Sequence, residues 1–288
     1  REGYEIYALN MKKNLCVIFK IIYLLILIIK FKPRIVQTWL YHANLIGGIA
    51  AKIAGIKKVY WTIHHDFEFR NLYMMLEMRI LVFLSYVIPD KIIYGSNPVR
   101  ENHILNGYFR EKSIVINNGV STSKFRSIPD YRDSIRKELN IPNHCLLLGN
   151  IARDNPLKDH ETLFKALKIL KTENINFKCI LIGPGLSNKN KEFKIRIKKY
   201  GIEDKVILYG KTYYLSNILN AFDINILTSK KECSPISLIE SMSTGIPCIT
   251  TNVGNANELI GNSGWVVNTS DYESIAKLIM EINRDKNI

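Results

Sequence analysis

The stretch "LTSKKECSPISLIESMSTGIPCITT", residues 227–251, carries the signals from which the fold is predicted. Ser234 suits an N-cap and Pro235 suits the first helical position, while Gly245 and Pro247 stop a helix, so we expect one over residues 235–244. Apolar runs rich in Ile and Thr flank it on both sides, as is typical of buried parallel strands. The stretch therefore predicts a strand, a loop, a short helix and a second strand.

Two glutamates lie eight positions apart within this stretch, Glu232 and Glu240. Glu232 falls in the loop after the first strand, where open α/β sheets bind ligands. Glu240 falls in the second turn of the helix. The N-terminus of the helix lies between them and offers unpaired N–H groups and a positive dipole end, which favour a phosphate group.

The same alternation of strand and helix extends in both directions. Before residue 125 it gives strands at "RIVQTWL", "KKVYWTIHH", "DKIIYGS" and "SIVINNGV", and after residue 143 it gives six more, from "LLLGNIA" to "GWVV". Between them lies a polar stretch with Pro129 and Pro142. We predict an α/β protein of two Rossmann-like domains, residues 1–125 and 144–288, joined by a linker at 126–143.

Composition narrows the class of protein. The net charge is +14, which is compatible with nucleic acid, an anionic membrane, phosphorylated substrates or a plain bias toward Lys, Ile and Asn. Basic runs interleaved with aromatic residues are absent from the sequence, so a nucleic-acid partner is not expected. The five cysteines, which include Cys16, are scattered and odd in number, which predicts a reducing cytoplasm and no metal site.

The most apolar segment is "LCVIFKIIYLLILIIKF", residues 15–31. Its longest uninterrupted apolar run is nine residues, 21–29, whereas a span needs about 20. We expect a helix that is hydrophobic on all sides to be buried in a core or between domains, with a lipid-facing helix as the alternative.

Three further motifs follow predicted strands. Arg153 and Lys158 lie in the loop "GNIARDNPLKDHETL", where the cations would neutralise a diphosphate or would simply be solvated. Gly183 and Gly185 flank Pro184 in "LIGPG", either to admit a ligand close to the backbone or to form a plain turn. His64 and the residue after it end a strand, either as structural residues or as donors to a substrate hydroxyl.

These motifs, in this order and spacing, resemble the nucleotide-sugar site of the retaining glycosyltransferases of family 4, which have the GT-B fold. The text "RIVQTWLYHANLIGGIAAKIAGIKKVYWTIHH" is similar to the branch that builds bacterial surface polysaccharides. The resemblance covers nearly the whole chain. It implies two Rossmann-like domains facing each other across a crevice. It also implies transfer of a sugar, with retention, from a nucleoside-diphosphate sugar to an acceptor hydroxyl.

The resemblance also implies a role for each motif. Glu240 would accept hydrogen bonds from the ribose, and Glu232 would hold donor-sugar hydroxyls. Arg153 and Lys158 would meet the leaving-group charge without a bound metal. Further contacts to the nucleotide would come from the loop glycines and the start of the helix, namely Gly183, Gly185, Ser234, Pro235, Ile236 and Ser237. In the first domain His64 would reach the donor sugar, with His65 as the alternative.

The sequence departs from the family pattern in three places. Cys233 replaces the usual Gly after the first motif glutamate. The chain opens at "REGYEIYALN", which is similar to the second or third strand region, without the Gly-rich loop that lines the acceptor site. Nothing after Lys286 supplies the crossover helix. These departures predict an intact donor half-site and an incomplete acceptor half-site, and hence nucleotide binding with poor turnover.

The expected partners are a nucleotide sugar, with UDP as the nucleotide, and a glycan or lipid-linked acceptor. The expected place is the cytoplasm, with attachment to the anionic inner face of the membrane. A nucleotide-sugar epimerase on the same fold and a non-catalytic nucleotide-sugar-binding subunit remain open alternatives. A glycoside hydrolase with Glu232 and Glu240 as its carboxylate pair is not expected, because one lies in a loop and the other in a helix.

Overall fold

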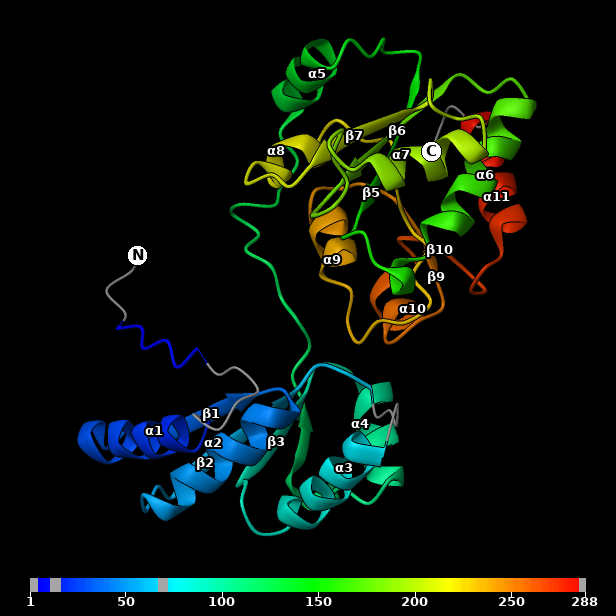
Figure 1. Ribbon diagram of the computed structural model, residues 1–288. Coiled ribbons are helices and arrows are strands. Elements are labelled where there is room, and N and C mark those ends of the chain that lie inside the picture. Colours follow the sequence, from blue (N-terminus) through cyan, green and yellow to red (C-terminus); the bar gives the residue numbers. More distant parts are fainter. Residues whose placement is uncertain (1–4, 11–16, 67–71, 285–288) are drawn as a thin grey trace. The chain divides into compact units, whose positions relative to one another are not determined.

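The computed structural model describes residues 5–10, 17–66 and 72–284. The chain divides into two compact units, residues 1–117 and 118–288 (Figure 1). Cys16, the first residues of the predicted helix 15–31, residues 1–4 and the tail after Arg284 lie outside the described residues. Residues 5–10 form no strand, contrary to the prediction for the start of the chain.

Unit 1 contains a parallel sheet of four strands in the order β1-β2-β3-β4. Its elements are α1 (Val17–Phe31), β1 (Ile35–Trp39), α2 (Tyr41–Ile53), β2 (Lys58–Ile63), α3 (Leu72–Ser85), β3 (Lys91–Tyr94), α4 (Asn97–Leu105), a 3-10 turn (Arg110–Lys112) and β4 (Ser113–Val115). The small residues of α2 allow it to pack tightly on the sheet. A Cβ at Gly48 would lie 2.7 Å from the indole nitrogen of Trp61.

Helix α1 differs from the prediction of a buried helix. It contacts α2 on one side, and Ile28 is buried. The opposite side is exposed, with Phe19 at 74% and Ile26 at 54% relative exposure. A sequence that is hydrophobic on all sides reveals no direction of burial, and among the described residues of this unit it is the side of α1 toward α2 that is covered. In the part of the chain that the structure describes, no helix has the length and apolar character needed to cross a membrane.

Unit 2 contains a parallel sheet of six strands in the order β10-β9-β8-β5-β6-β7. Its elements are α5 (Pro129–Glu138), β5 (Leu146–Ile151), a 3-10 turn (Pro156–Lys158), α6 (His160–Thr172), β6 (Phe177–Ile182), α7 (Lys191–Lys199), β7 (Val206–Gly210), α8 (Leu215–Leu219), β8 (Ile224–Leu227), α9 (Ile236–Ser243), β9 (Cys248–Thr251), α10 (Ala256–Ile260), β10 (Gly264–Val267) and α11 (Tyr272–Arg284).

Both faces of the second sheet are covered. Along β6, Cys179 and Leu181 belong to the core under α6, α7 and α11, while Ile180 and Ile182 belong to the core under α5 and α8. Alternate residues of a strand point to opposite faces, so a continuous apolar run matches a strand buried on both sides. Helices α6 and α11 lie side by side on one of these faces (Figure 1).

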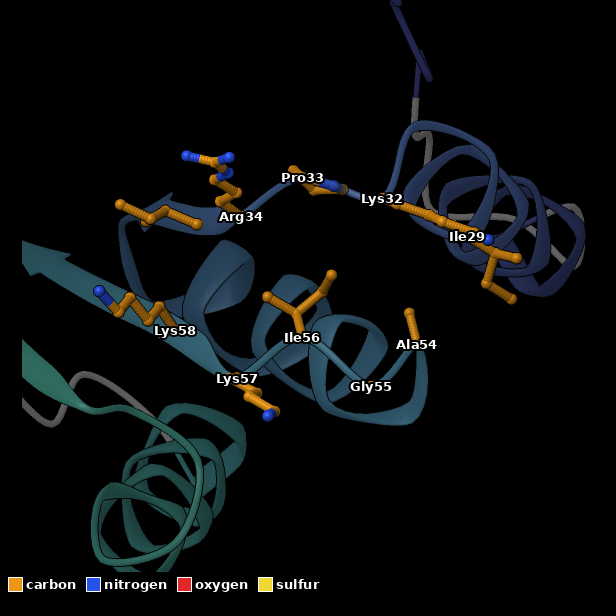
Figure 2. A pocket seen from close by; sticks show the side chains of 10 residues that line it. Ile29, Lys32, Pro33, Arg34, Ala54, Gly55, Ile56, Lys57 and Lys58 are labelled. Carbon is orange, nitrogen blue, oxygen red and sulfur yellow. The ribbon is translucent and has the colours of Figure 1, made fainter.

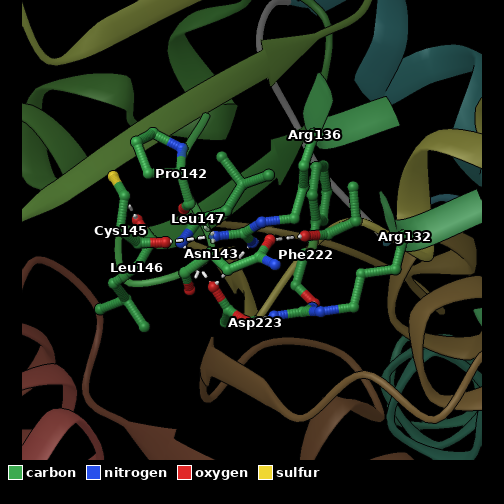
Figure 3. Close-up of polar contacts among 10 residues, drawn as sticks. Arg132, Arg136, Pro142, Asn143, Cys145, Leu146, Leu147, Phe222 and Asp223 are labelled. Carbon is green, nitrogen blue, oxygen red and sulfur yellow. Dashed lines mark hydrogen bonds and ion pairs between the residues drawn. The ribbon is translucent and has the colours of Figure 1, made fainter. Parts of the chain in front are cut away.

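The segment 126–143, predicted as a linker, contains α5 and packs on unit 2 (Figure 3). Arg136 is 1% exposed, and its guanidinium donates to the carbonyl oxygens of Ala221 at 3.1 Å and Pro142 at 2.9 Å. It also pairs with Asp223 at 3.2 Å, and that carboxylate accepts from the N–H of Leu147 at 2.6 Å. These bonds tie α5 to the starts of β5 and β8, so the division between the units falls earlier, after residue 117.

Candidate functional site

The charged motifs of unit 2 follow strands at the middle of the sheet. Arg153 follows β5, Glu232 follows β8, and the turn from Gly183 to Gly185 follows β6. Strand β5 has β8 on one side and β6 on the other. The chain therefore reverses its direction of winding at β5 and β8, and open α/β sheets bind ligands at the carboxyl ends of strands at such a point.

Lys158 and Glu232 form an ion pair across this edge of the sheet. Both side chains are mostly buried, at 19% and 14% relative exposure. The hydroxyl of Ser229 donates to the same carboxylate oxygen of Glu232 at 2.6 Å. The backbones are joined as well, because the hydroxyl of Thr228 donates to the carbonyl of Lys158 at 3.0 Å. The lysine and the glutamate are thus held in fixed positions before any ligand binds.

Arg153 is exposed and has no hydrogen bond or ion pair with any residue in the described ranges. Its neighbour Asp154 is held by Arg196 at 3.0 Å and by the side-chain amide of Asn190 at 3.1 Å. The backbone N–H of Asp154 donates to the carbonyl of Pro184 at 2.8 Å. The loop is therefore fixed while the Arg153 guanidinium remains available to a ligand.

The glycine turn after β6 packs against the loop that carries Arg153. A Cβ at Gly183 would lie 1.8 Å from the carbonyl oxygen of Ala152, and φ at Gly183 is +148°. A Cβ at Gly185 would lie 2.6 Å from the Asp154 side chain, and φ there is +84°. Both positions require glycine because the turn packs directly against the loop that carries Arg153.

Helix α9 starts one residue later than predicted. Pro235 is its N-cap, no side chain caps it, and the buried hydroxyl of Ser234 has no hydrogen-bond partner among the described residues. The predicted capping contact of Ser234 is therefore wrong. The Ser234 carbonyl instead accepts from the side chain of Asn118 at 3.1 Å. The first N–H groups of α9, at Ile236 and Ser237, lack an intrahelical partner by the geometry of helices and remain available to an anion.

Glu240 lies on α9 and is partly buried. Burial raises the pKa of its carboxyl group, and the positive charge of Lys124 partly offsets this. Within the described residues no hydrogen bond or ion pair reaches the carboxylate of Glu240, although its backbone carbonyl accepts from the Thr244 hydroxyl at 3.4 Å. A half-buried carboxylate without a partner is costly unless a ligand supplies hydroxyl donors.

At Cys233, where the sequence departs from the family pattern, the backbone packs tightly against the loop after β9. Gly254 has φ +55°, and a Cβ there would lie 2.3 Å from the carbonyl oxygen of Cys233 and 2.6 Å from that of Glu232. The N–H of Asn255 donates to the Cys233 carbonyl at 3.2 Å. The loop after β9 therefore closes tightly on the backbone of the motif, and its glycine makes that approach possible.

In unit 1 the two histidines differ. His64 follows β2, is partly buried, and stacks on Trp39 with ring centroids 5.3 Å apart and planes 11° apart. Burial lowers the pKa of His64, and neighbouring His65 lowers it further. The buried Nε2 of His64 has no hydrogen-bond partner within the described residues, whereas His65 is exposed. Near neutral pH, His64 is thus an uncharged imidazole with an unused nitrogen.

The sequence analysis did not predict two further residues at the carboxyl ends of the unit 1 strands, Trp39 and His42. Trp39 ends β1, which is adjacent to β2, and it is 54% exposed. His42, in the first turn of α2, pairs with the buried carboxylate of Glu77 on α3. The aromatic and histidine residues at and just after the end of the strand in "TWLYH" were the signal that the sequence offered, because side chains at the carboxyl ends of adjacent parallel strands converge.

Metal binding has no candidate in the described ranges. Among residues 5–10, 17–66 and 72–284, no group of three or more His, Cys, Asp or Glu residues is arranged to hold a metal ion. Cys145, Cys179 and Cys248 are buried thiols that form no disulfide within the described residues.

Comparison with known proteins gives two family models. The model described as "Glycosyl transferases group 1" matches residues 131–288, and "Glycosyltransferase Family 4" matches residues 1–124. The chain is 26% identical over 265 residues to the UDP-Gal:alpha-D-GlcNAc-diphosphoundecaprenol alpha-1,3-galactosyltransferase of Escherichia coli, covering 89% of this chain and 68% of that enzyme. It is 24% identical to the capsular polysaccharide biosynthesis glycosyltransferase CapM of Staphylococcus aureus, covering 98% and 76%.

Among solved structures, Anabaena Alr3699/HepE in complex with UDP and glucose superposes with a TM-score of 0.85 at 20% identity, covering 98% of this chain and 77% of that one. This likeness, together with the two parallel sheets and their helices, confirms the predicted α/β class and GT-B fold.

Proposed function

The chain belongs to the Glycosyl transferases group 1 family, and on that premise we propose that it moves a sugar from a nucleoside-diphosphate sugar to a hydroxyl of a glycan or lipid-linked acceptor. The observation that carries the proposal is the edge of the second sheet at β5 and β8. There a fixed Lys158–Glu232 pair, an Arg153 with no ion pair to any described residue, and the start of α9, which no described side chain caps, lie on the loops that follow adjacent strands.

Each part of this edge is suited to one part of a nucleotide sugar. Arg153 offers a planar donor fork and Lys158 a point charge, and both would stabilise the diphosphate as it leaves with growing negative charge. The N–H groups at the start of α9 add donors of the same polarity. Glu240, farther along α9, would accept hydrogen bonds from the ribose hydroxyls, which would give its partly buried carboxylate the partners it lacks.

Glu232 would serve both the lysine and the sugar. Its carboxylate holds Lys158 and the hydroxyl of Ser229 through one oxygen, Oε1. The second oxygen would accept hydrogen bonds from donor-sugar hydroxyls. In unit 1, the neutral His64 would contact the same sugar through its unused Nε2. We propose transfer with retained anomeric configuration and charge neutralisation without a metal, so that activity survives EDTA.

The relatives support a specific substrate class. The galactosyltransferase of Escherichia coli is named for a UDP-sugar donor and a diphosphoundecaprenol acceptor, and CapM is named for capsular polysaccharide biosynthesis. The structural neighbour Alr3699/HepE was solved with UDP and glucose. We therefore propose a UDP-linked hexose as the donor and surface polysaccharide as the product.

Calorimetric titration of the chain with UDP, GDP and ADP tests the donor site. We expect one nucleotide to bind, and we expect Glu240→Ala and the double variant Arg153→Ala with Lys158→Ala each to weaken binding by roughly tenfold or more, the value of one or two charge-assisted hydrogen bonds. Lys168→Ala is the matched control, because Lys168 is exposed on α6 and forms no ion pair in the described ranges. Equal affinity in all three variants would overturn the assignment of the site.

A further inference from the structure

His42 and Glu77 form a pair in unit 1 that has no role in binding the sugar donor. His42 lies in the first turn of α2, and Glu77 lies on α3. The Glu77 side chain is 7% exposed, and its carboxylate pairs with Nδ1 of His42. A carboxylate can only accept a hydrogen bond, so Nδ1 carries the hydrogen and donates it. In the neutral ring, Nε2 is then left with a lone pair that accepts hydrogen bonds.

The exposure of His42 distinguishes this pair from a purely structural one. Its side chain is 71% exposed, and no residue of the described ranges forms a hydrogen bond to Nε2. For stability alone, an apolar residue at position 77 would serve as well as a buried carboxylate. A buried carboxylate behind an exposed imidazole instead fixes the ring and its tautomer, as in the catalytic triads of hydrolases, where Nε2 faces a hydroxyl.

The backbone next to His42 is strained. Leu40, which connects β1 to α2, has φ +74° and ψ 161°, a combination that is populated almost only by glycine. Its N–H donates to the carbonyl of Thr62 at 3.1 Å, and its carbonyl accepts from the N–H of Asn44 at 2.8 Å. Residues strained in this way persist where the surrounding structure holds them, and they concentrate at binding and catalytic sites.

Trp39 supplies an apolar surface at the same end of β1. His64 stacks on its ring with centroids 5.3 Å apart, yet Trp39 remains 54% exposed. An exposed indole is a large, rigid apolar surface on which the C–H face of a sugar ring can pack. Sites for small molecules combine such aromatic surface with a few polar groups that fix orientation. Here His42, three residues after Trp39, is the polar group.

The hollow shown in Figure 2 lies at the opposite edge of the same sheet. It lies between the end of α1 and the residues directly before β1 and β2, among them Arg34 and Lys57. Open α/β sheets bind ligands at the carboxyl ends of their strands, whereas this hollow lies at the amino ends. Trp39, His42 and His64 lie at the carboxyl ends, so the ligand of these residues is not expected in the hollow.

We propose that Trp39 and His42 bind the sugar that accepts the transferred group. The pyranose ring of this sugar packs on Trp39, and one of its hydroxyls donates to Nε2 of His42, which Glu77 orients. The inference rests on the proposed sugar transfer, because it names residues of unit 1 that bind the acceptor of that reaction. A metal ion is a poorer occupant, because the described residues contain no group of three His, Cys, Asp or Glu that could hold one.

NMR spectroscopy of the full chain, with isotope-labelled histidine and tryptophan, tests the proposal. The probes are the methyl pyranosides of glucose, galactose, mannose and N-acetylglucosamine. We expect at least one of them to shift the signals of the His42 ring and the Trp39 indole, and to leave those of His144, an exposed residue of unit 2, unchanged. His42→Ala and Trp39→Ala are each expected to weaken this binding by roughly tenfold, the effect of one hydrogen bond or one ring contact.

The same spectra test Glu77 as the positioning residue. The nitrogen shifts of His42 are expected to show the hydrogen on Nδ1 in the unchanged chain and on Nε2 in Glu77→Leu, with a roughly tenfold loss of sugar affinity in that variant. Glu77→Gln is the matched control, because its amide oxygen still accepts from Nδ1 and should preserve both the tautomer and the affinity. Circular dichroism verifies that each variant is folded.

UDP, GDP and ADP titrations of the same samples separate this inference from the donor site. Binding of a nucleotide without a sugar-induced shift at His42 and Trp39 would overturn the inference and leave the proposed function standing. Sugar binding that keeps its full strength in His42→Ala and Glu77→Leu would overturn it as well. Failure of all three nucleotides to bind would overturn the proposed sugar transfer, and with it an acceptor role for any sugar bound at Trp39.

Discussion

At the scale of the residue, His64 and His65 form a matched pair for mutation. We expect His64→Ala to lower kcat/KM for the nucleotide sugar by roughly tenfold to a hundredfold, the range for losing one hydrogen bond to a substrate hydroxyl in a buried site. His65→Ala is expected to change it little, because that side chain is exposed. Steady-state kinetics of both variants measure the contrast. Equal losses would show that His64 has no special role.

Gly183 tests whether the glycine turn positions the Arg153 loop. We expect Gly183→Ala to weaken UDP binding, because the added Cβ would meet the Ala152 carbonyl oxygen at 1.8 Å and push the loop away. Gly201→Ala is the control: it also has positive φ, but nothing lies within 4 Å of its Cβ. It should cost only about 1 kcal/mol of stability and leave UDP binding intact. Unchanged UDP affinity in Gly183→Ala would contradict this role.

The site residues could be predicted individually, but their pairing could not. Spacing and resemblance pointed to Arg153, Lys158, Glu232 and Glu240, and the structure shows two of them, Lys158 and Glu232, in contact. That contact depends on β5 lying beside β8 in the sheet, although two other strands, β6 and β7, lie between them in the sequence. The sequence also could not show that the Arg153 guanidinium lacks an ion pair within the described residues, because its neighbour Asp154 is held by Arg196, which lies 42 residues away.

At the scale of the element, local sequence signals predicted most helices and strands. Where such signals were lacking, as at α5, the element was not predicted. Gly245 has φ +78° and ends α9 as its position in the sequence predicted. Helix α5 was read as a linker because its sequence is polar and lies between two prolines. Its stability comes from Arg136, a residue that sequence patterns assign to the surface but that the structure buries completely.

Arg136 therefore gives a prediction about α5. We expect Arg136→Met to lower the free energy of unfolding of unit 2 by about 3 to 5 kcal/mol, because it leaves Asp223 and several carbonyl oxygens short of donors. Arg132→Met should cost less, because Arg132 is 39% exposed and makes fewer bonds. Urea denaturation of the two variants measures the difference. A free linker would tolerate both substitutions equally.

At the scale of the whole molecule, each unit contains a buried histidine whose neutral form is favoured. Burial lowers the pKa of His103 in unit 1 to about 4, and burial also lowers that of His160 in unit 2 to about 4. Both rings pack against aromatic residues, His103 edge-on to Tyr108 and His160 edge-on to Phe193. Acid should therefore weaken both units, because each folded unit must bury an imidazole without its proton.

The direction in which stability changes with pH follows from the difference between the pKa of each histidine in the unfolded and in the folded chain. In the unfolded chain a histidine gains its proton below about pH 6.5, whereas in the folded chain it stays neutral down to about pH 4. The stability that each contributes is complete above pH 6.5 and is lost as the pH falls toward 4. Between about pH 7.5 and 5 the expected loss is on the order of 2 kcal/mol for each histidine.

Replacing His160 would measure how much one buried histidine contributes to the loss of stability in acid. Neither ring nitrogen of His160 has a hydrogen-bond partner among the described residues, so His160→Met removes a titrating group without breaking a hydrogen bond. We expect urea denaturation of this variant to show a smaller loss of stability between about pH 7.5 and 5, by on the order of 2 kcal/mol. His144→Met, at an exposed position, should keep the full loss. If both variants follow the unchanged chain, acid destabilises the protein through groups other than the buried imidazole of unit 2.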